Sequence, residues 1–84
     1  MITDKILDNY KKLSRNKNTW SFLFRISGVK TKFLIKKFNN DYIIYITQSD
    51  KEDIFEYSIC LGKLTSTEDL ENIFLSITRG EHLS

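Results

Sequence analysis

The sequence has very few of the residues from which active sites and metal centres are built. Cys60 is the only cysteine and His82 the only histidine, so neither an internal disulfide nor a zinc-binding cluster of thiolates and imidazoles can form. Proline is absent, and the three glycines stand alone at positions 28, 62 and 80, so there is no glycine-rich phosphate loop. We therefore expect a non-catalytic protein that holds no metal and no cofactor.

Long apolar runs and a secretory signal are also missing. No stretch approaches the roughly 20 apolar residues that a membrane-spanning helix needs. Residues 1–12 contain acids where a signal peptide would be basic. These absences predict a cytoplasmic protein that does not act at a membrane. With 84 residues, 40% of them hydrophobic and 29% charged, the chain fits a single folded domain over residues 1–84.

The hydrophobic periodicity predicts an α+β fold, a four-stranded antiparallel β-meander flanked by an N-terminal and a C-terminal helix. Helical spacing runs from Ile6 to Leu13, with Thr3 as the N-cap, and a polar loop is expected over 14–18. A second helical stripe begins at Leu70. Its cap is predicted as Thr65 with Glu68 or Ser66 with Asp69, and its end at Gly80.

Between the helices the hydrophobic period is two. We predict strands at 20–27, 30–38, 42–47 and 54–61, with Cys60 buried in the last one. The turns are too short for parallel crossovers, so the strands must be antiparallel. If both helices pack on one face, the other face is left partly apolar and is a candidate interface. The alternative is that the helices divide between the two faces and cover both.

Charge is distributed unevenly along the chain. Residues 1–38 contain ten Lys or Arg and two Asp or Glu, a net charge of +8, whereas residues 39–84 contain three and nine, a net charge of −6. The overall value of +2 conceals this asymmetry. Such a separation suggests a partner that is attracted by charge.

Two basic clusters and one acidic cluster are the candidate partner-binding residues. The first basic cluster, near the end of the first helix, is Lys11, Lys12, Arg15 and Lys17, and the second, on the second strand, is Lys30, Lys32, Lys36 and Lys37. Lysines that share a strand face can follow the phosphates of a nucleic acid, or they can simply keep an exposed strand from aggregating. The acidic cluster is Asp50, Glu52, Asp53 and Glu56. It is either a solvated surface or a knob that fits a basic groove.

The order of elements resembles that of the small phage anti-CRISPR proteins over about residues 3–53. The resemblance is carried by the segments Arg25-Ile26-Ser27-Gly28, Phe33-Leu34-Ile35-Lys36, Asn39-Asn40-Asp41 and Tyr42-Ile43-Ile44, followed by an acidic hairpin. It implies a protein of phage or mobile-element type that inhibits a bacterial defence complex through protein–protein contact. Asp50, Glu52, Asp53 and Glu56 would then be the contacting residues.

The chain departs from the acidic members of that group because its net charge is +2 and its first half is basic. The lysines would therefore need a target of their own, such as guide RNA or an acidic protein surface. The partner expected from the resemblance is a larger protein or ribonucleoprotein complex. Two alternatives remain open: a nucleic-acid-binding accessory protein that uses its lysine-rich face, and a homodimer that pairs through the sheet.

Overall fold

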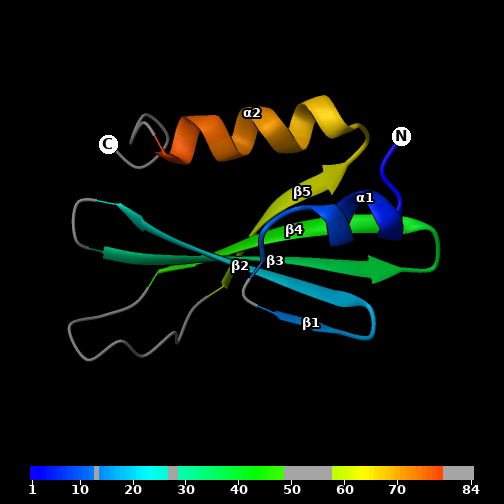
Figure 1. Cartoon of the computed structure of the whole chain (residues 1–84), viewed down its shortest axis with the longest axis horizontal. Coiled ribbons are helices and arrows are strands. Elements are labelled where there is room, and N and C mark those ends of the chain that lie inside the picture. The colour runs from blue at the N-terminus through cyan, green and yellow to red at the C-terminus, as the bar shows by residue number, and fades with distance from the viewer. Residues whose placement is uncertain (13, 27–28, 49–57, 79–84) are drawn as a thin grey trace.

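A computed structural model describes residues 1–12, 14–26, 29–48 and 58–78. The protein is α+β, with an antiparallel five-stranded sheet in the order β1-β2-β3-β4-β5 (Figure 1). The elements in chain order are α1 (Asp4–Asn9), β1 (Ser14–Asn16), β2 (Thr19–Ile26), β3 (Val29–Phe38), β4 (Asp41–Gln48), β5 (Ser58–Leu64) and α2 (Thr67–Thr78). The predicted class and the antiparallel arrangement are confirmed, whereas the predicted number of four strands is wrong.

The additional strand, β1, replaces the polar loop that the sequence predicted. The Thr3 hydroxyl accepts a hydrogen bond from the amide of Ile6 at 3.2 Å, which confirms the N-cap of α1. The helix, however, ends at Asn9 instead of continuing toward Leu13. The chain then turns back, and Arg15 in β1 pairs with Trp20 in β2. Tertiary pairing has therefore overridden the helical pattern of the local sequence.

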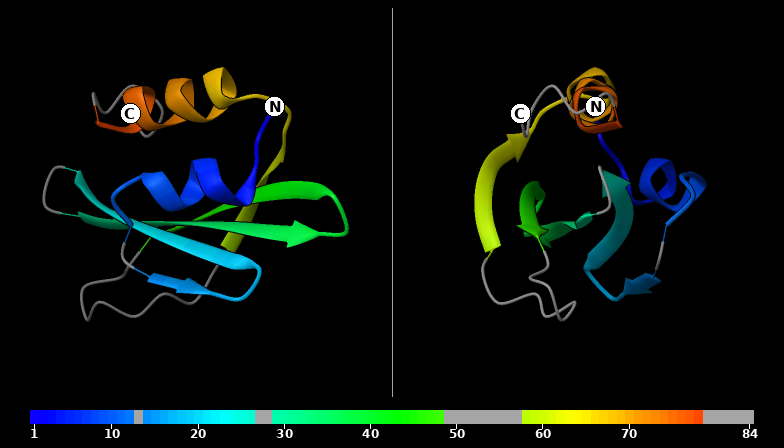
Figure 2. Two further views of the ribbon diagram at one scale, coloured as in Figure 1. Left: turned by 45° about the vertical axis from the view of Figure 1, so that its right-hand side comes forward. Right: turned by 90° about the vertical axis from the view of Figure 1, so that its left-hand side faces the viewer.

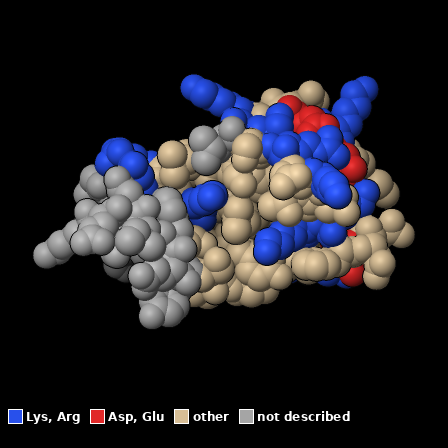
Figure 3. Space-filling view, turned by 90° about the horizontal axis from the view of Figure 1, so that it is seen from below, with Lys and Arg blue, Asp and Glu red and all other residues tan. Residues whose placement is uncertain are grey.

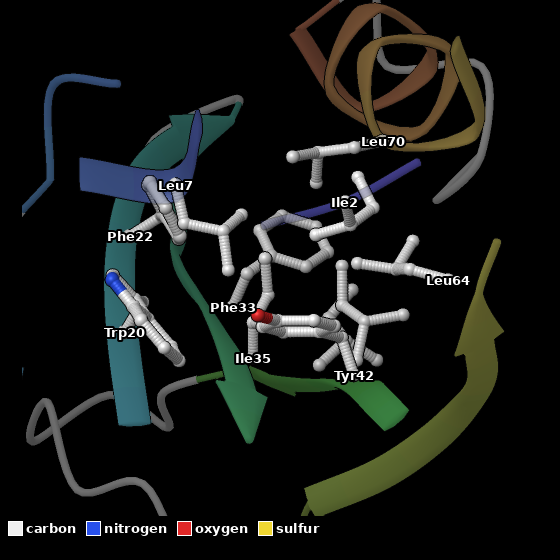
Figure 4. Packing of buried hydrophobic residues seen from close by; sticks show 11 residues of the cluster. Ile2, Leu7, Trp20, Phe22, Phe33, Ile35, Tyr42, Leu64 and Leu70 are labelled. Atoms are coloured by element: carbon white, nitrogen blue, oxygen red, sulfur yellow. The ribbon is translucent and has the colours of Figure 1, made fainter. Parts of the chain in front are cut away.

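The three central strands follow the predicted alternation. Trp20 and Phe22 in β2, Phe33 and Ile35 in β3, and Ile44 in β4 are all buried toward the helices. The turn between β3 and β4 contains Asn39 at φ 56°, as expected for an asparagine that tolerates a left-handed backbone. Figure 4 shows the side chains of β2 and β3 among these converging beneath α1 and α2. The buried hydrophobic cluster comprises Ile2, Leu7, Trp20, Phe22, Phe33, Ile35, Tyr42, Ile44, Ile46, Leu64 and Leu70.

The last strand extends further along the chain than predicted. β5 spans Ser58–Leu64, and residues 54–57 of the predicted strand lie outside the described residues. Its register against β4 shifts between Ile44 and Tyr45, and Gly62 adopts φ +129°, which an L side chain rarely does. Beyond this irregularity Leu64 reaches the core. Cys60 pairs with Tyr45 and is exposed, so the prediction of a buried cysteine is wrong.

The C-terminal helix confirms one of its two predicted caps. The Ser66 hydroxyl accepts a hydrogen bond from the amide of Asp69 at 3.1 Å. Leu70 anchors α2 in the core, and the ring of Phe74 lies 5.2 Å from that of Phe22 and 5.2 Å from that of Phe24. The predicted stop at Gly80 lies outside the described residues. Neither described helix is long and apolar enough to cross a membrane.

Both helices lie on the same side of the sheet. Figure 2 shows the strongly twisted sheet curving around α1 and α2 on its concave side. Of the two arrangements that the sequence left open, the structure therefore has the one in which both helices share a face. No described element covers the opposite face.

Candidate binding face

On the helix side, Asp4 and Asp8 of α1 form hydrogen bonds with side chains of the sheet, and they form ion pairs with two of the predicted basic residues. Asp8 accepts hydrogen bonds from Trp20 Nε1 at 2.9 Å and from the Arg15 guanidinium at 2.7 Å. The guanidinium also lies 4.6 Å from the centroid of the Trp20 ring, a cation–π contact. Asp4 accepts from the hydroxyl of Tyr42 and from Lys37 Nζ, the latter at 3.1 Å.

These contacts shift the titration of the groups around Asp4. The hydrogen bond from Tyr42 and the nearby Lys37 and Arg15 lower the pKa of Asp4. Burial, followed by the hydrogen bond to Asp4, raises the pKa of Tyr42. The hydrogen bond to Asp4 raises the pKa of Lys37. The three directions favour the ionised Asp4 carboxylate, the Lys37 ammonium and the neutral Tyr42 hydroxyl, so at neutral pH both donors keep their hydrogen bonds to Asp4.

The structure thus divides the eight predicted basic residues into different settings. Arg15 and Lys37 are bound to the aspartates of α1, and Lys12 Nζ donates to the backbone carbonyl of Asp8 at 3.0 Å. The remaining five are not brought together in one patch. Lys11 and Lys17 are exposed after α1 and in the β1–β2 turn, whereas Lys30, Lys32 and Lys36 share the opposite side of the sheet, since alternate residues of β3 point the same way.

We call the side of the sheet away from the helices the outer face. The strand registers place on it Ser21, Leu23, Arg25, Lys30, Lys32, Leu34, Lys36, Phe38, Asp41, Ile43, Tyr45, Thr47, Ser58, Cys60 and Lys63. Five of these are cations and one is an acid, Asp41, whose carboxylate lies 3.3 Å from Lys63 Nζ. Figure 3 looks onto this face and shows basic side chains spread over the part that is not grey, with acidic ones at its upper right and lower right.

The helix side is balanced instead. Its described cations are Lys5, Lys11, Lys12, Arg15 and Lys37, and its described acids are Asp4, Asp8, Glu68, Asp69 and Glu71; Lys17, in the β1–β2 turn, is counted on neither side. Charge is therefore segregated between the two sides of the sheet among the described residues, a separation that the division of the sequence into halves did not reveal.

Apolar groups interrupt the cations of the outer face. Leu34 and Tyr45 pair directly across β3 and β4, and both are half-buried by their neighbours. Lys36 lies one step along β3, with Nζ 5.3 Å from the centroid of the Tyr45 ring. Phe38, one step further along, is 53% exposed. Sequence reasoning missed Phe38 as a binding candidate, whereas Tyr45, with Ile43, was one of two apolar pairs that it left open for the uncovered face.

Other parts of the chain provide weaker candidates for a functional site. The predicted acidic residues Asp50, Glu52, Asp53 and Glu56 lie outside the described residues, as does His82. Within the described part, no group of three His, Cys, Asp or Glu side chains is placed to hold a metal ion. A hollow of about 410 Å³ at the N-terminal end of the molecule is lined in part by Lys37 and Tyr42, whose polar atoms are already bound to Asp4.

No protein-family model, curated protein or solved structure matches this chain. The resemblance to the small phage anti-CRISPR proteins, and with it the role of the acidic residues, therefore stays a prediction.

Proposed function

We propose that this is a non-catalytic binding protein whose outer face docks onto a larger, negatively charged partner. The observation that supports the proposal is the segregation of charge among the residues that the structure describes. Five cations and one acid lie on a face that no described element covers (Figure 1), against five and five on the helix side. A surface with one dominant sign of charge attracts a partner of the opposite sign and orients it during encounter.

The apolar residues of the outer face would add binding free energy to the attraction between charges. Leu23 is 43% exposed, and Ile43 and Leu34 remain partly accessible between the lysines. Contact with a partner would remove this area from water at about 25 cal/mol per Å². A mixture of cations and apolar groups therefore suits a specific surface better than a purely charged one.

The partner that we propose is a complex that contains nucleic acid. A bacterial defence nuclease is the example that the anti-CRISPR resemblance implies, and modulation of such a complex is the corresponding activity. Self-association through the outer face is disfavoured, since it would bring five cations against five. A dimer that light scattering detects and that Lys36→Glu dissociates would contradict this part of the proposal.

Two matched double variants test the role of the outer face. K32E/K36E reverses two charges on it, and K5E/K11E reverses two exposed charges on the helix side, so both change the net charge from +2 to −2. Binding to heparin and to a mixed-sequence DNA duplex is measured by fluorescence anisotropy over a salt series. We expect K32E/K36E to weaken binding and to reduce the salt slope by about two, because each lost phosphate contact removes about one unit.

The helix-side variant is the control. We expect K5E/K11E to change affinity only slightly, since long-range attraction is screened within about 8 Å at physiological ionic strength. Equal losses in the two variants would show that net charge, and not the outer face, governs binding. Circular dichroism and thermal unfolding check that both variants remain folded.

A further inference from the structure

On the basis of the proposed function, we propose that the outer face binds single-stranded nucleic acid, with bases stacked on Tyr45 and Phe38 and phosphates held by the lysines between and beside them. The observation is the order of side chains along one line of the sheet. From Phe38 inward, the two-residue steps of β3 present an aromatic ring, Lys36, the Leu34–Tyr45 pair, Lys32 and Lys30.

The spacing of this line suits a single strand. Each step along the strand is about 6.6 Å, so Lys32 and Lys36 stand about 13 Å apart, with the apolar Leu34–Tyr45 pair between them. Between Phe38 and Lys32, rings and cations therefore alternate at steps of about 6.6 Å. Proteins that bind single strands combine these two elements, a basic track for the backbone and aromatic platforms for the bases.

Tyr45 differs from the tyrosines on the helix side. The hydroxyl of Tyr10 donates to Glu71 at 3.1 Å, and that of Tyr42 donates to Asp4, so both side chains serve the packing of the helices. Tyr45 instead contacts Lys36, whose ammonium lies 5.3 Å from its ring centroid. A base that stacks on Tyr45 takes the place of this ammonium over the ring, which leaves Lys36 beside the base, where it can hold a phosphate.

A duplex would use this surface less fully. Its bases are stacked within the helix, so Tyr45, Phe38 and Leu34 would meet only sugar and phosphate. The lysines would still attract the duplex, but Tyr45, Phe38 and Leu34 would contribute little to binding. We therefore expect a preference for single strands over duplexes and over polyanions without bases.

The experiment compares oligo(dT), oligo(U), a DNA duplex of equal length and heparin, each titrated with the protein and followed by fluorescence anisotropy. We expect the two single strands to bind more tightly than the duplex and heparin. Tyr45→Ala and Phe38→Ala should each weaken single-strand binding on the order of 10-fold to 100-fold, the value of one stacked base. Tyr45→Phe should bind as the unaltered protein does, since it keeps the ring.

Leu75→Ala is the matched control, because Leu75 is 50% exposed on α2, away from the outer face. It should leave binding unchanged. If duplex and heparin bind as tightly as single strands and Tyr45→Ala has no effect, the stacking inference is overturned while the proposed polyanion-binding face stands. If none of the four probes binds at low salt, both proposals are overturned, and a protein surface becomes the remaining partner.

Discussion

Replacing Asp4 with alanine should destabilise the protein far more than the position of Asp4 in a short surface helix suggests. α1 has only six residues, too few to be stable alone, and Leu7 is its one buried residue. Asp4 accepts hydrogen bonds from Tyr42 in β4 and Lys37 in β3. The substitution would leave the half-buried hydroxyl of Tyr42 without its acceptor.

The magnitude follows from these contacts. A hydrogen bond to a charged group contributes about 1.5–3 kcal/mol. Because the Asp4 side chain is 35% exposed, its ion pairs with Lys37 and Arg15 are screened by water and add at most about 1 kcal/mol. We expect a loss of about 2–3 kcal/mol in the free energy of unfolding. In a domain of this size that lowers Tm by roughly 8–20 °C.

Urea unfolding followed by circular dichroism measures the loss. The control is Asp41→Ala, which removes the same type of residue from an exposed ion pair, Asp41 with Lys63, at 54% and 56% exposure. Such a pair is worth less than about 1 kcal/mol. In a double-mutant cycle of Asp4→Ala with Tyr42→Phe, a coupling energy of about 1 kcal/mol or more is expected. If Asp4→Ala costs no more than Asp41→Ala, the reasoning about the α1 network is refuted.

The same network predicts a dependence on pH. The pKa of Asp4 is lowered in the folded state, chiefly by the hydrogen bond from Tyr42, so its unfolded value of 3.8 is the higher of the two. The stabilisation by Asp4 is therefore complete above the unfolded pKa and is lost as the pH falls through the folded one. The stability difference between the unaltered protein and Asp4→Ala should shrink on acidification below about pH 4. A difference that stays constant down to pH 2 would contradict this account.

Two further outcomes test other parts of the structure. Leu70→Ala should cost about 2–5 kcal/mol of unfolding free energy, because Leu70 is fully buried and anchors α2. Leu75→Ala, at an exposed position of the same helix, should cost less than about 1 kcal/mol. Equal losses would contradict the orientation of α2. Cys60 should react with iodoacetamide in the folded protein at nearly the rate seen in urea, because it is exposed on the outer face. Strong protection that disappears on unfolding would show that the side chain is buried after all.

The hydrophobic periodicity correctly predicted the parts of the fold that depend on contacts between residues close together in the sequence. Alternation along β2 and β3 correctly placed Trp20, Phe22, Phe33 and Ile35 on one side. The caps at Thr3 and Ser66 were also predictable, because a hydroxyl that accepts an amide hydrogen bond three residues ahead is a local interaction.

The errors arose where distant residues decide the structure. Tyr10 and Leu13 continue a helical stripe in the sequence, yet Arg15 is drawn back onto Asp8 and Trp20, so β1 forms instead. At β5, the alternation through Leu61 concealed the register shift and the positive φ of Gly62, which bring Leu64 into the core. Neither event leaves a periodic signal.

The candidate site was predictable only in part for the same reason. The shared face of Lys30, Lys32 and Lys36 follows from strand alternation, and the structure places all three on the outer face. The sequence did not predict the ion pairs of Lys37 with Asp4 and of Arg15 with Asp8, because each pair joins different elements of the fold. The importance of Phe38 and Tyr45 became visible only once both helices were known to lie on the opposite side.

The pairing of the α1 aspartates with Arg15 and Lys37 has a consequence for how the molecule moves. By balancing charge on the helix side, it leaves the centre of described positive charge displaced toward the sheet. If the proposed polyanionic partner exists, its field would act most strongly on the described cations of the sheet and would turn the outer face toward it before contact. Fewer encounters would then occur in unproductive orientations, and α1 and α2 would face away from the bound partner.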